Sequence, residues 1–112
     1  MAQGTRSGKA KVTAREFADA TGIDETAELM KLAGNSTRLK LLYLLESLTE
    51  VSVSDIAELL GVSVSAVSQH LAKLKAYGLV NGRRDAQTIY YRLAEHDFIG
   101  RLREEYFAAW AN

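Results

Sequence analysis

The stretch from Ser54 to Tyr77 decides the fold, and it reads SDIAELLGVSVSAVSQHLAKLKAY. Ser54 is a residue type that caps helix N-termini, and apolar residues follow it at helical spacing. Gly61 ends this first helix, because glycine adopts the left-handed conformation without a steric penalty. Ser63 then caps a second helix with its own apolar spacing. The apolar positions of the two helices are Ile56, Leu59, Leu60, Val67, Leu71 and Leu74.

Three residues indicate how these two helices cross. The small side chain of Ala57 lets the helices approach closely, and Gly61 makes the turn between them. Val67 is an aliphatic residue that fills the crossing point. This combination predicts a helix-turn-helix, whose second helix enters the major groove of DNA.

The exposed face predicted for the second helix is polar but almost uncharged. It carries Ser65, Ser68, Gln69 and Ala72, with Lys73 and Lys75 toward the end of the helix. Short hydroxyls and an amide suit a helix in a major groove, where they bond base edges and phosphates. A helix of small residues packed against protein is the alternative interpretation.

A basic hairpin is predicted directly after the second helix. Leu79–Arg84 and Thr88–Leu93 read as strands, and residues 85–87 form the tip between them. Asn81 and Gly82 form the strongest short turn signal in this region. A basic hairpin in this position is typical of the wing of a winged helix.

Upstream of Ser54, helical patterns alternate with short breaks. We expect Asp24 to cap a helix that ends at Ala33, and a central apolar helix to begin at Ser36. A loop over residues 49–53 then leads to the helix-turn-helix.

Residues 1–22 are predicted to be an arm, partly disordered, with a short helix that starts at a Thr13–Glu16 capping box. Residues 23–112 then form the single folded domain.

The last segment, residues 96–111, is predicted to be a helix with a broad apolar stripe. The stripe contains Phe98, Ile99, Leu102, Tyr106, Phe107 and Trp110. A terminal helix with this much aromatic surface favours a symmetric dimer interface in so small a domain. Packing on its own core alone is the alternative.

Composition limits the class of protein. The 112 residues contain no cysteine, so disulfides and thiolate metal sites are excluded. No apolar run approaches the ~20 residues of a membrane span, and the first residues lack the apolar core of a signal peptide. We therefore expect a cytoplasmic protein without a membrane partner.

The net charge is zero, but residues 62–92 carry a net charge of +4 and residues 16–28 a net charge of −5. One face can therefore be basic enough for nucleic acid.

Enzymatic and cofactor chemistry finds little support. Ser65, Ser68 and His70 lie close in sequence, but they share one helix and lack a glycine-rich oxyanion loop. No phosphate-binding glycine motif occurs. We predict that the protein is not an enzyme and holds no cofactor, and that His70 is structural or contacts phosphate.

From about Asp24 to Trp110 the chain resembles the ArsR/SmtB family of winged-helix repressors. The resemblance rests on LAGNSTRLKLLYLL from Leu32, EVSVSDIAELLGVSVSAVSQHLAKLKAYGLV from Glu50 and RRDAQTIYYRL from Arg83. It implies a mostly α-helical fold of about five helices and a two-stranded wing, which forms a homodimer through the first and last helices. It also implies repression by binding a palindromic operator, with an effector that weakens DNA binding. The residues predicted for the dimer interface are Leu29, Phe98, Leu102, Tyr106 and Trp110.

The metal sites of that family do not carry over. Ser52 and Ser54 stand where many members have two thiolates, and a hydroxyl is a poor ligand for soft metals. Whether these serines are native or replace cysteines stays open. A second family site on the last helix would have only its first half, near His96, since Ala108 and Ala111 stand at the second. No metal site is therefore predicted. A metal-responsive repressor with a non-cysteine site and a winged-helix protein-interaction module are the alternatives.

The predicted DNA-binding residues divide by role. Serine and amide side chains of the second helix should reach base edges, basic side chains should contact phosphates, and Gln87 should approach the minor groove. The sequence leaves open the operator, the effector and the choice between repression and activation. The predicted DNA-binding residues are Ser65, Ser68, Gln69, His70, Lys73, Arg83, Arg84 and Gln87.

Overall fold

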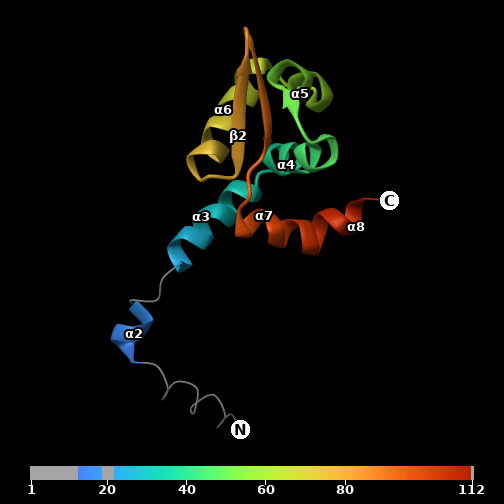
Figure 1. The fold of residues 1–112 in the computed structure, drawn as a ribbon. Coiled ribbons are helices and arrows are strands. Elements are labelled where there is room, and N and C mark those ends of the chain that lie inside the picture. Colours follow the sequence, from blue (N-terminus) through green and yellow to red (C-terminus); the bar gives the residue numbers. More distant parts are fainter. Residues whose placement is uncertain (1–12, 19–21, 112) are drawn as a thin grey trace.

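A computed structural model describes residues 13–18 and 22–111, which form helices around a small antiparallel sheet (Figure 1). The helices are α2 (Ala14–Ala18), α3 (Ile23–Ala33), α4 (Ser36–Leu48), α5 (Val53–Leu60), α6 (Val64–Ala76), α7 (Asp97–Leu102), η1 (Arg103–Phe107) and α8 (Ala108–Trp110). The strands are β1 (Val51–Ser52), β2 (Val80–Asp85) and β3 (Thr88–Leu93). The predicted mostly helical winged helix-turn-helix is confirmed.

The N-terminal arm is described only in part. Thr13 and Glu16 form the predicted capping box, in which each side chain accepts a 3.1 Å hydrogen bond from the other residue's backbone N–H. Residues 1–12 and 19–21 lie outside the described part, so the prediction for the rest of the arm is not addressed. No helix among the described residues is long and apolar enough to cross a membrane.

The helix-turn-helix consists of α5 and α6. Gly61 adopts the left-handed conformation with φ 69°, and the backbone N–H of Val62 donates to the carbonyl of Ala57. Ala57 and Val67 are buried at the crossing, with 5% and 0% of their surface exposed. The roles predicted for Ala57, Gly61 and Val67 are therefore confirmed.

Two helix starts differ from the prediction. Ser52, and not Ser54, caps α5, because its Oγ accepts a 3.1 Å hydrogen bond from the backbone N–H of Asp55. Ser52 is the last extended residue before the helix, since β1 runs directly into α5. Asp24 lies inside α3, which begins after Gly22 without a side-chain cap. The central helix α4 begins at Ser36 as predicted, and Asn35 caps it, because its Oδ1 accepts from the backbone N–H of Arg38.

The segment predicted as a loop over residues 49–53 contains the short strand β1. It pairs with β3 in the register Val51 opposite Tyr91 and Ser52 opposite Tyr90, so the sheet order is β1-β3-β2. Two residues are too few to show the alternating pattern that identifies a strand in sequence. Because β1 pairs with β3 of the wing and leads directly into α5, this strand connects the wing to the start of the helix-turn-helix.

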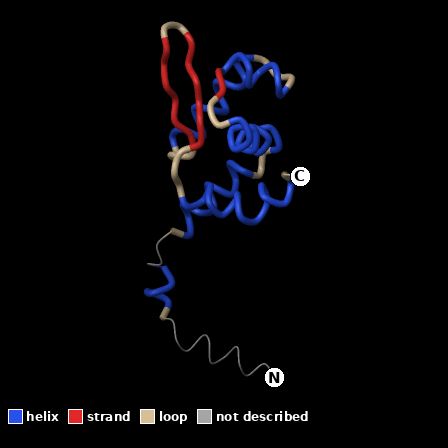
Figure 2. The backbone as a smooth tube through the Cα atoms, turned by 45° about the vertical axis from the view of Figure 1, so that its right-hand side comes forward, coloured by secondary structure: helices blue, strands red, loops and turns tan. Residues whose placement is uncertain are grey.

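The wing is a long hairpin that projects from the helices (Figure 2). The turn signal at Asn81-Gly82 is not used; both residues lie inside β2, as predicted for the strand Leu79–Arg84, with Gly82 opposite Tyr91. A Cβ atom at Gly82 would come within 3.0 Å of the Tyr91 ring, so this glycine makes room for an aromatic side chain. The turn lies at Ala86-Gln87, within the tip predicted at residues 85–87, and Ala86 takes a positive φ of 58°.

The core is centred on α4, which lies between the helix-turn-helix and the C-terminal helix (Figure 2). Leu41, Leu42 and Leu45 are completely or almost completely buried. Arg103 of η1 donates two 2.9 Å hydrogen bonds to the carboxylate of Glu46 of α4. These bonds hold the C-terminal helix against α4.

The C-terminal helix is continuous, as predicted, but one turn of it is a π-helix over η1. A π turn contains one residue more than an α turn. The buried residues Ile99, Leu102 and Phe107 are therefore three and five positions apart. As a result Phe107 faces the core and Tyr106, which regular helical spacing would place there, is exposed.

Candidate nucleic-acid interface

Helix α6 presents the residues predicted to read bases. Its first turn is capped by Ser63, whose Oγ accepts from the backbone N–H of Ala66 at 3.0 Å. One side of the helix is fixed in the core by buried Val67, Leu71 and Leu74. The exposed residues of α6 include Ser65, Ser68, Gln69, Ala72 and Lys73. The structure therefore places the predicted base-reading residues on one accessible face.

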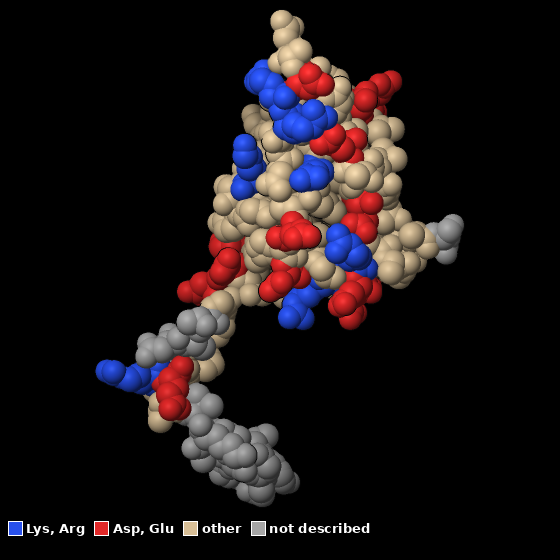
Figure 3. Space-filling model, viewed as in Figure 1, with Lys and Arg blue, Asp and Glu red and all other residues tan. Residues whose placement is uncertain are grey.

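The electrostatics around α6 favour an anion. The helix contains no acidic residue, and Lys73 and Lys75 lie in its last turn, where cations complement the helix dipole. Lys and Arg side chains gather on the upper part of the molecule, over α6 and the hairpin, with fewer acidic side chains among them (Figure 3). Acidic side chains are more frequent on the lower part, toward α3 and the C-terminal helix. The neutral chain thus has a basic end.

Arg83 is held by an ion pair within the chain. Its guanidinium donates hydrogen bonds of 3.2 and 2.9 Å to Glu50, and it lies 5.0 Å from the centre of the Tyr90 ring. The hydrogen bonds to Glu50 raise the pKa of Arg83, and the same bonds lower the pKa of the Glu50 carboxyl. A phosphate contact by Arg83, as predicted, requires it to share or leave this partner.

Arg84 and Gln87 are more accessible. They are exposed near the end of the hairpin, where Arg84 makes a long 3.5 Å hydrogen bond to the carbonyl of Ala86. Arg84 follows Arg83 in the same strand, so the two side chains point to opposite faces of the hairpin. The wing can therefore offer Arg84 and Gln87 to a partner without breaking the ion pair of Arg83.

His70 differs from the other predicted DNA-binding residues. It is half-buried on the flank of α6, between the exposed face and the core, where its Nδ1 lies 3.4 Å from the guanidinium of Arg38. Burial, and then the charges of Arg38 and Lys73, lower the pKa of His70. The structure gives this histidine an intramolecular partner. The sequence reasoning missed Arg38, because nothing in the helical pattern of α4 indicates a contact 32 positions away.

The side chain of His96 caps a helix. Its Nδ1 caps α7 by accepting a 3.1 Å hydrogen bond from the backbone N–H of Phe98. Within residues 13–18 and 22–111, no three His, Asp or Glu side chains are grouped closely enough to hold a metal ion. Ser52, where the family resemblance implies a thiolate, is likewise occupied as the cap of α5.

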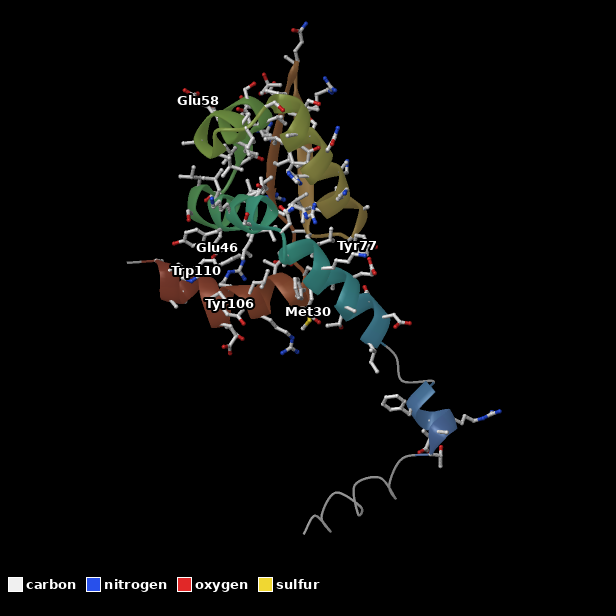
Figure 4. All side chains as sticks on the ribbon, turned by 180° about the vertical axis from the view of Figure 1, so that it is seen from behind. Met30, Glu46, Glu58, Tyr77, Tyr106 and Trp110 are labelled. Carbon is white, nitrogen blue, oxygen red and sulfur yellow. The ribbon has the colours of Figure 1, made fainter. Side chains whose placement is uncertain are left out.

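The predicted dimer interface divides into buried and exposed members. Leu29 and Leu102 are only 5% and 7% exposed in the single chain, so they belong mainly to its own core. Tyr106 and Trp110 are 51% and 45% exposed, with ring centroids 6.0 Å apart. On α3, Met30 is 61% exposed, and Figure 4 shows it beside the C-terminal helix that carries Tyr106. These exposed apolar side chains remain available to a partner.

Comparison with known proteins gives consistent relatives. Residues 35–82 match the model of the bacterial regulatory protein, arsR family. The chain is 41% identical to the HTH-type transcriptional regulator KmtR of Mycobacterium tuberculosis over 67% of this chain and 56% of KmtR. It is 46% identical to the transcriptional activator HlyU of Vibrio cholerae over 59% of this chain and 60% of HlyU. The chain thus matches somewhat more than half the length of these two relatives.

Solved structures agree with the sequence relatives. The structure of HlyU from Vibrio cholerae matches with a TM-score of 0.65 and 38% identity, over 74% of this chain and 92% of that chain. The solution structure of the homodimeric winged helix-turn-helix DNA-binding domain of Mb0332 from Mycobacterium bovis matches with a TM-score of 0.65 and 34% identity. That match covers 87% of this chain and 82% of the Mb0332 chain.

Proposed function

The chain belongs to the ArsR family of bacterial transcriptional regulators, and we propose that it is a dimeric repressor that binds a palindromic operator. In this proposal α6 lies in the major groove, and Ser65, Ser68 and Gln69 read base edges. Lys73 and Arg84 contact phosphates, and Gln87 approaches the minor groove from the wing. The protein acts in the cytoplasm, where its DNA is found.

The observation that carries the proposal is the exposed face of α6. Three short polar side chains share that face, and no acidic residue interrupts it. A helix that only faced solvent would more often carry glutamate and lysine along this side. Hydroxyl and amide groups instead match the donors and acceptors that base pairs display in the major groove.

The dimer sets the length of the operator. A homodimer related by two-fold symmetry places its two recognition helices about 34 Å apart, so they read half-sites one helical turn apart. Tight binding at both half-sites would block access to the promoter, which gives repression. The relative HlyU is named a transcriptional activator. Whether DNA binding represses or activates transcription is therefore a separate question from whether the protein binds the operator.

We further propose that the protein does not sense metals through thiolates. The sequence contains no cysteine, and the position of Ser52 is occupied by a helix cap. The direct test is fluorescence anisotropy with DNA from upstream of the gene and a shuffled duplex, across a salt series, with and without zinc. We expect sequence-selective, salt-sensitive binding that zinc leaves unchanged. Release by zinc would instead support the alternative of a metal-responsive repressor with a non-cysteine site, and equal affinity for both duplexes would contradict operator recognition.

The substitution Gln69→Ala should relax specificity at one base position. An amide that bonds a base edge discriminates against the wrong base by about 1–3 kcal/mol. We expect the variant to bind the best operator more weakly and to lose its preference at a single position in a panel of operator variants. If Gln69→Ala ranks all operator variants as the parent does, Gln69 does not read a base.

The substitution Arg84→Ala should weaken binding to all sequences alike. Loss of one phosphate contact removes about one released counterion, so the slope of log K against log salt becomes shallower by about one unit. Arg101→Ala is the matched control, because Arg101 is also an exposed arginine but lies on α7, away from the wing. Equal effects of the two substitutions would contradict a specific contact by Arg84.

A further inference from the structure

Arg38 connects three helices. It lies in the first turn of α4, and its side chain reaches back to the end of α3 and across to α6. Its Nε donates a 2.9 Å hydrogen bond to the carbonyl oxygen of Leu32, and its Nη1 lies 3.4 Å from Nδ1 of His70. The residue is half-buried, so these contacts are partly shielded from solvent.

The contact with Leu32 satisfies the end of a helix. The last carbonyl groups of an α-helix lack partners within the helix and carry its negative dipole end. The carbonyl of Leu32 also receives a long 3.5 Å hydrogen bond from the backbone N–H of Asn35. The guanidinium therefore supplies both a donor and a positive charge at the C-terminus of α3.

The contact with His70 defines the protonation state of its ring. A guanidinium has donors and no acceptor, so Nδ1 must accept and cannot carry a proton. The ring is then neutral with its proton on Nε2. A protonated ring would have donors at both nitrogens and would lose the bond to Arg38.

We propose that Arg38 and neutral His70 form a lock that fixes the recognition helix α6 against α3 and α4. Arg38 is a positioning residue in this proposal, because it acts on DNA only through the orientation of α6. The effect on DNA affinity rests on the proposed function, whereas the lock itself does not. Since α3 also carries exposed Met30 beside the C-terminal helix, the lock links a proposed interface helix to the DNA-reading helix.

The charges around His70 determine how the lock responds to acid. Arg38 faces the ring from α4, and Lys73 lies one turn further along α6. Glu28 and Lys31 of α3 line the adjoining groove, together with Arg38 and Lys73. Burial and the two nearest cations lower the pKa of His70, so the lock persists at neutral pH. It opens only when the pH falls through that lowered pKa.

Nuclear magnetic resonance of the ring nitrogens tests the lock without DNA. We expect the Nε2–H tautomer for His70 in the parent protein at pH 7. In Arg38→Met the two tautomers should mix and the pKa of His70 should rise. Lys73→Met is the matched control, since it removes a neighbouring charge but keeps the bond, so the pKa should rise while the tautomer persists. A protonated Nδ1 in the parent, or an unchanged tautomer in Arg38→Met, would overturn the proposal.

A pair of His70 variants tests the effect on DNA affinity. The amide of His70→Asn places an acceptor near the position of Nδ1, whereas His70→Gln places it near Nε2. We expect His70→Asn to bind operator DNA as the parent does at pH 7.5. His70→Gln and Arg38→Met should each bind operator DNA roughly tenfold more weakly than the parent. The double variant with both substitutions should bind no more weakly than either single variant, because the losses in binding free energy of two interacting residues do not add.

Acidification separates the parent from His70→Asn. The affinity of the parent should fall as the pH is lowered through the lowered pKa of His70 and the ring protonates, and that of His70→Asn should change less. Full affinity of His70→Gln, or additive losses in the double variant, would overturn the lock. Circular dichroism of each variant checks that the fold is kept. If the parent itself binds no operator, the proposed function fails, while the ring-nitrogen spectra still decide the lock.

Discussion

Phe107→Ala should lower the free energy of unfolding by about 3–5 kcal/mol, the usual cost of truncating a buried phenylalanine. Only 2% of Phe107 is exposed, and its ring lies 5.4 Å from that of Tyr43 and 5.7 Å from that of Trp110. The substitution leaves a cavity and removes two aromatic contacts. Domains of this size have a total stability of about 5–15 kcal/mol, so the loss would be a large part of it. Urea unfolding at fixed protein concentration measures the change.

Tyr106→Ala is the matched control for this experiment. Tyr106 is the preceding residue of the same π turn, but 51% of it is exposed. Its replacement should leave the stability of the single chain within about 0.5 kcal/mol, as for surface sites. Any further loss should depend on protein concentration, because a dimer contact stabilises by mass action. The opposite pattern, with a small effect for Phe107 and a large concentration-independent effect for Tyr106, would contradict the π turn.

This pair of residues illustrates what the sequence could not provide. The apolar stripe of the last helix was predictable from composition and approximate spacing. The π turn was not, because one extra residue in a turn leaves no local signal. It is stabilised by packing and by the ion pair between Arg103 and Glu46, which lie 57 positions apart. The prediction therefore included both aromatic residues in one stripe and could not say which of them faces the core.

The helix-turn-helix was predictable because its determinants are local. Ala57, Gly61 and Val67 act over ten positions, and Ser63 caps the second helix as expected. The errors occurred where distant segments meet. Ser52 replaced Ser54 as the cap because β1 pairs with β3, a contact that links residues about 40 positions apart.

The wing and its charges show the same division. The two strands and the tip at residues 85–87 were predicted, whereas the strong turn signal at Asn81-Gly82 is not used: both residues lie inside β2, where the ring of Tyr91 lies beside Gly82. The sequence also could not distinguish Arg83 from Arg84. Only the fold brings Glu50 to Arg83 and leaves Arg84 accessible.

Tyr106→Glu should separate the proposed dimer and cause the largest loss of operator affinity. A carboxylate placed in an apolar interface must either lose its hydration or keep the subunits apart, and both are costly. Two linked half-site contacts bind about 10²–10⁴ times more tightly than one. We therefore expect a monomer that binds the operator about two to four orders of magnitude more weakly. Sedimentation equilibrium and anisotropy measure the two effects.

The fold should survive this substitution, because Tyr106 is half-exposed and its aromatic neighbour Phe107 occupies the core. Trp110 is the only tryptophan of the chain and lies 6.0 Å from Tyr106 between ring centroids. Its fluorescence should shift to longer wavelength when the interface opens, which reports dissociation independently of DNA. Half-site binding that remains should keep its dependence on salt, since the phosphate contacts of each monomer are intact.

Leu48→Glu is the control that locates the interface. Leu48 is 50% exposed, like Tyr106, but it ends α4 and borders a groove with Leu59 of α5. The same added charge at this site should leave the dimer intact and the tryptophan spectrum unchanged. Dissociation by Leu48→Glu, with a stable dimer in Tyr106→Glu, would instead place the interface on the α4–α5 side. An interface there would lie next to the helix-turn-helix, so the spacing of the two recognition helices would have to be derived again.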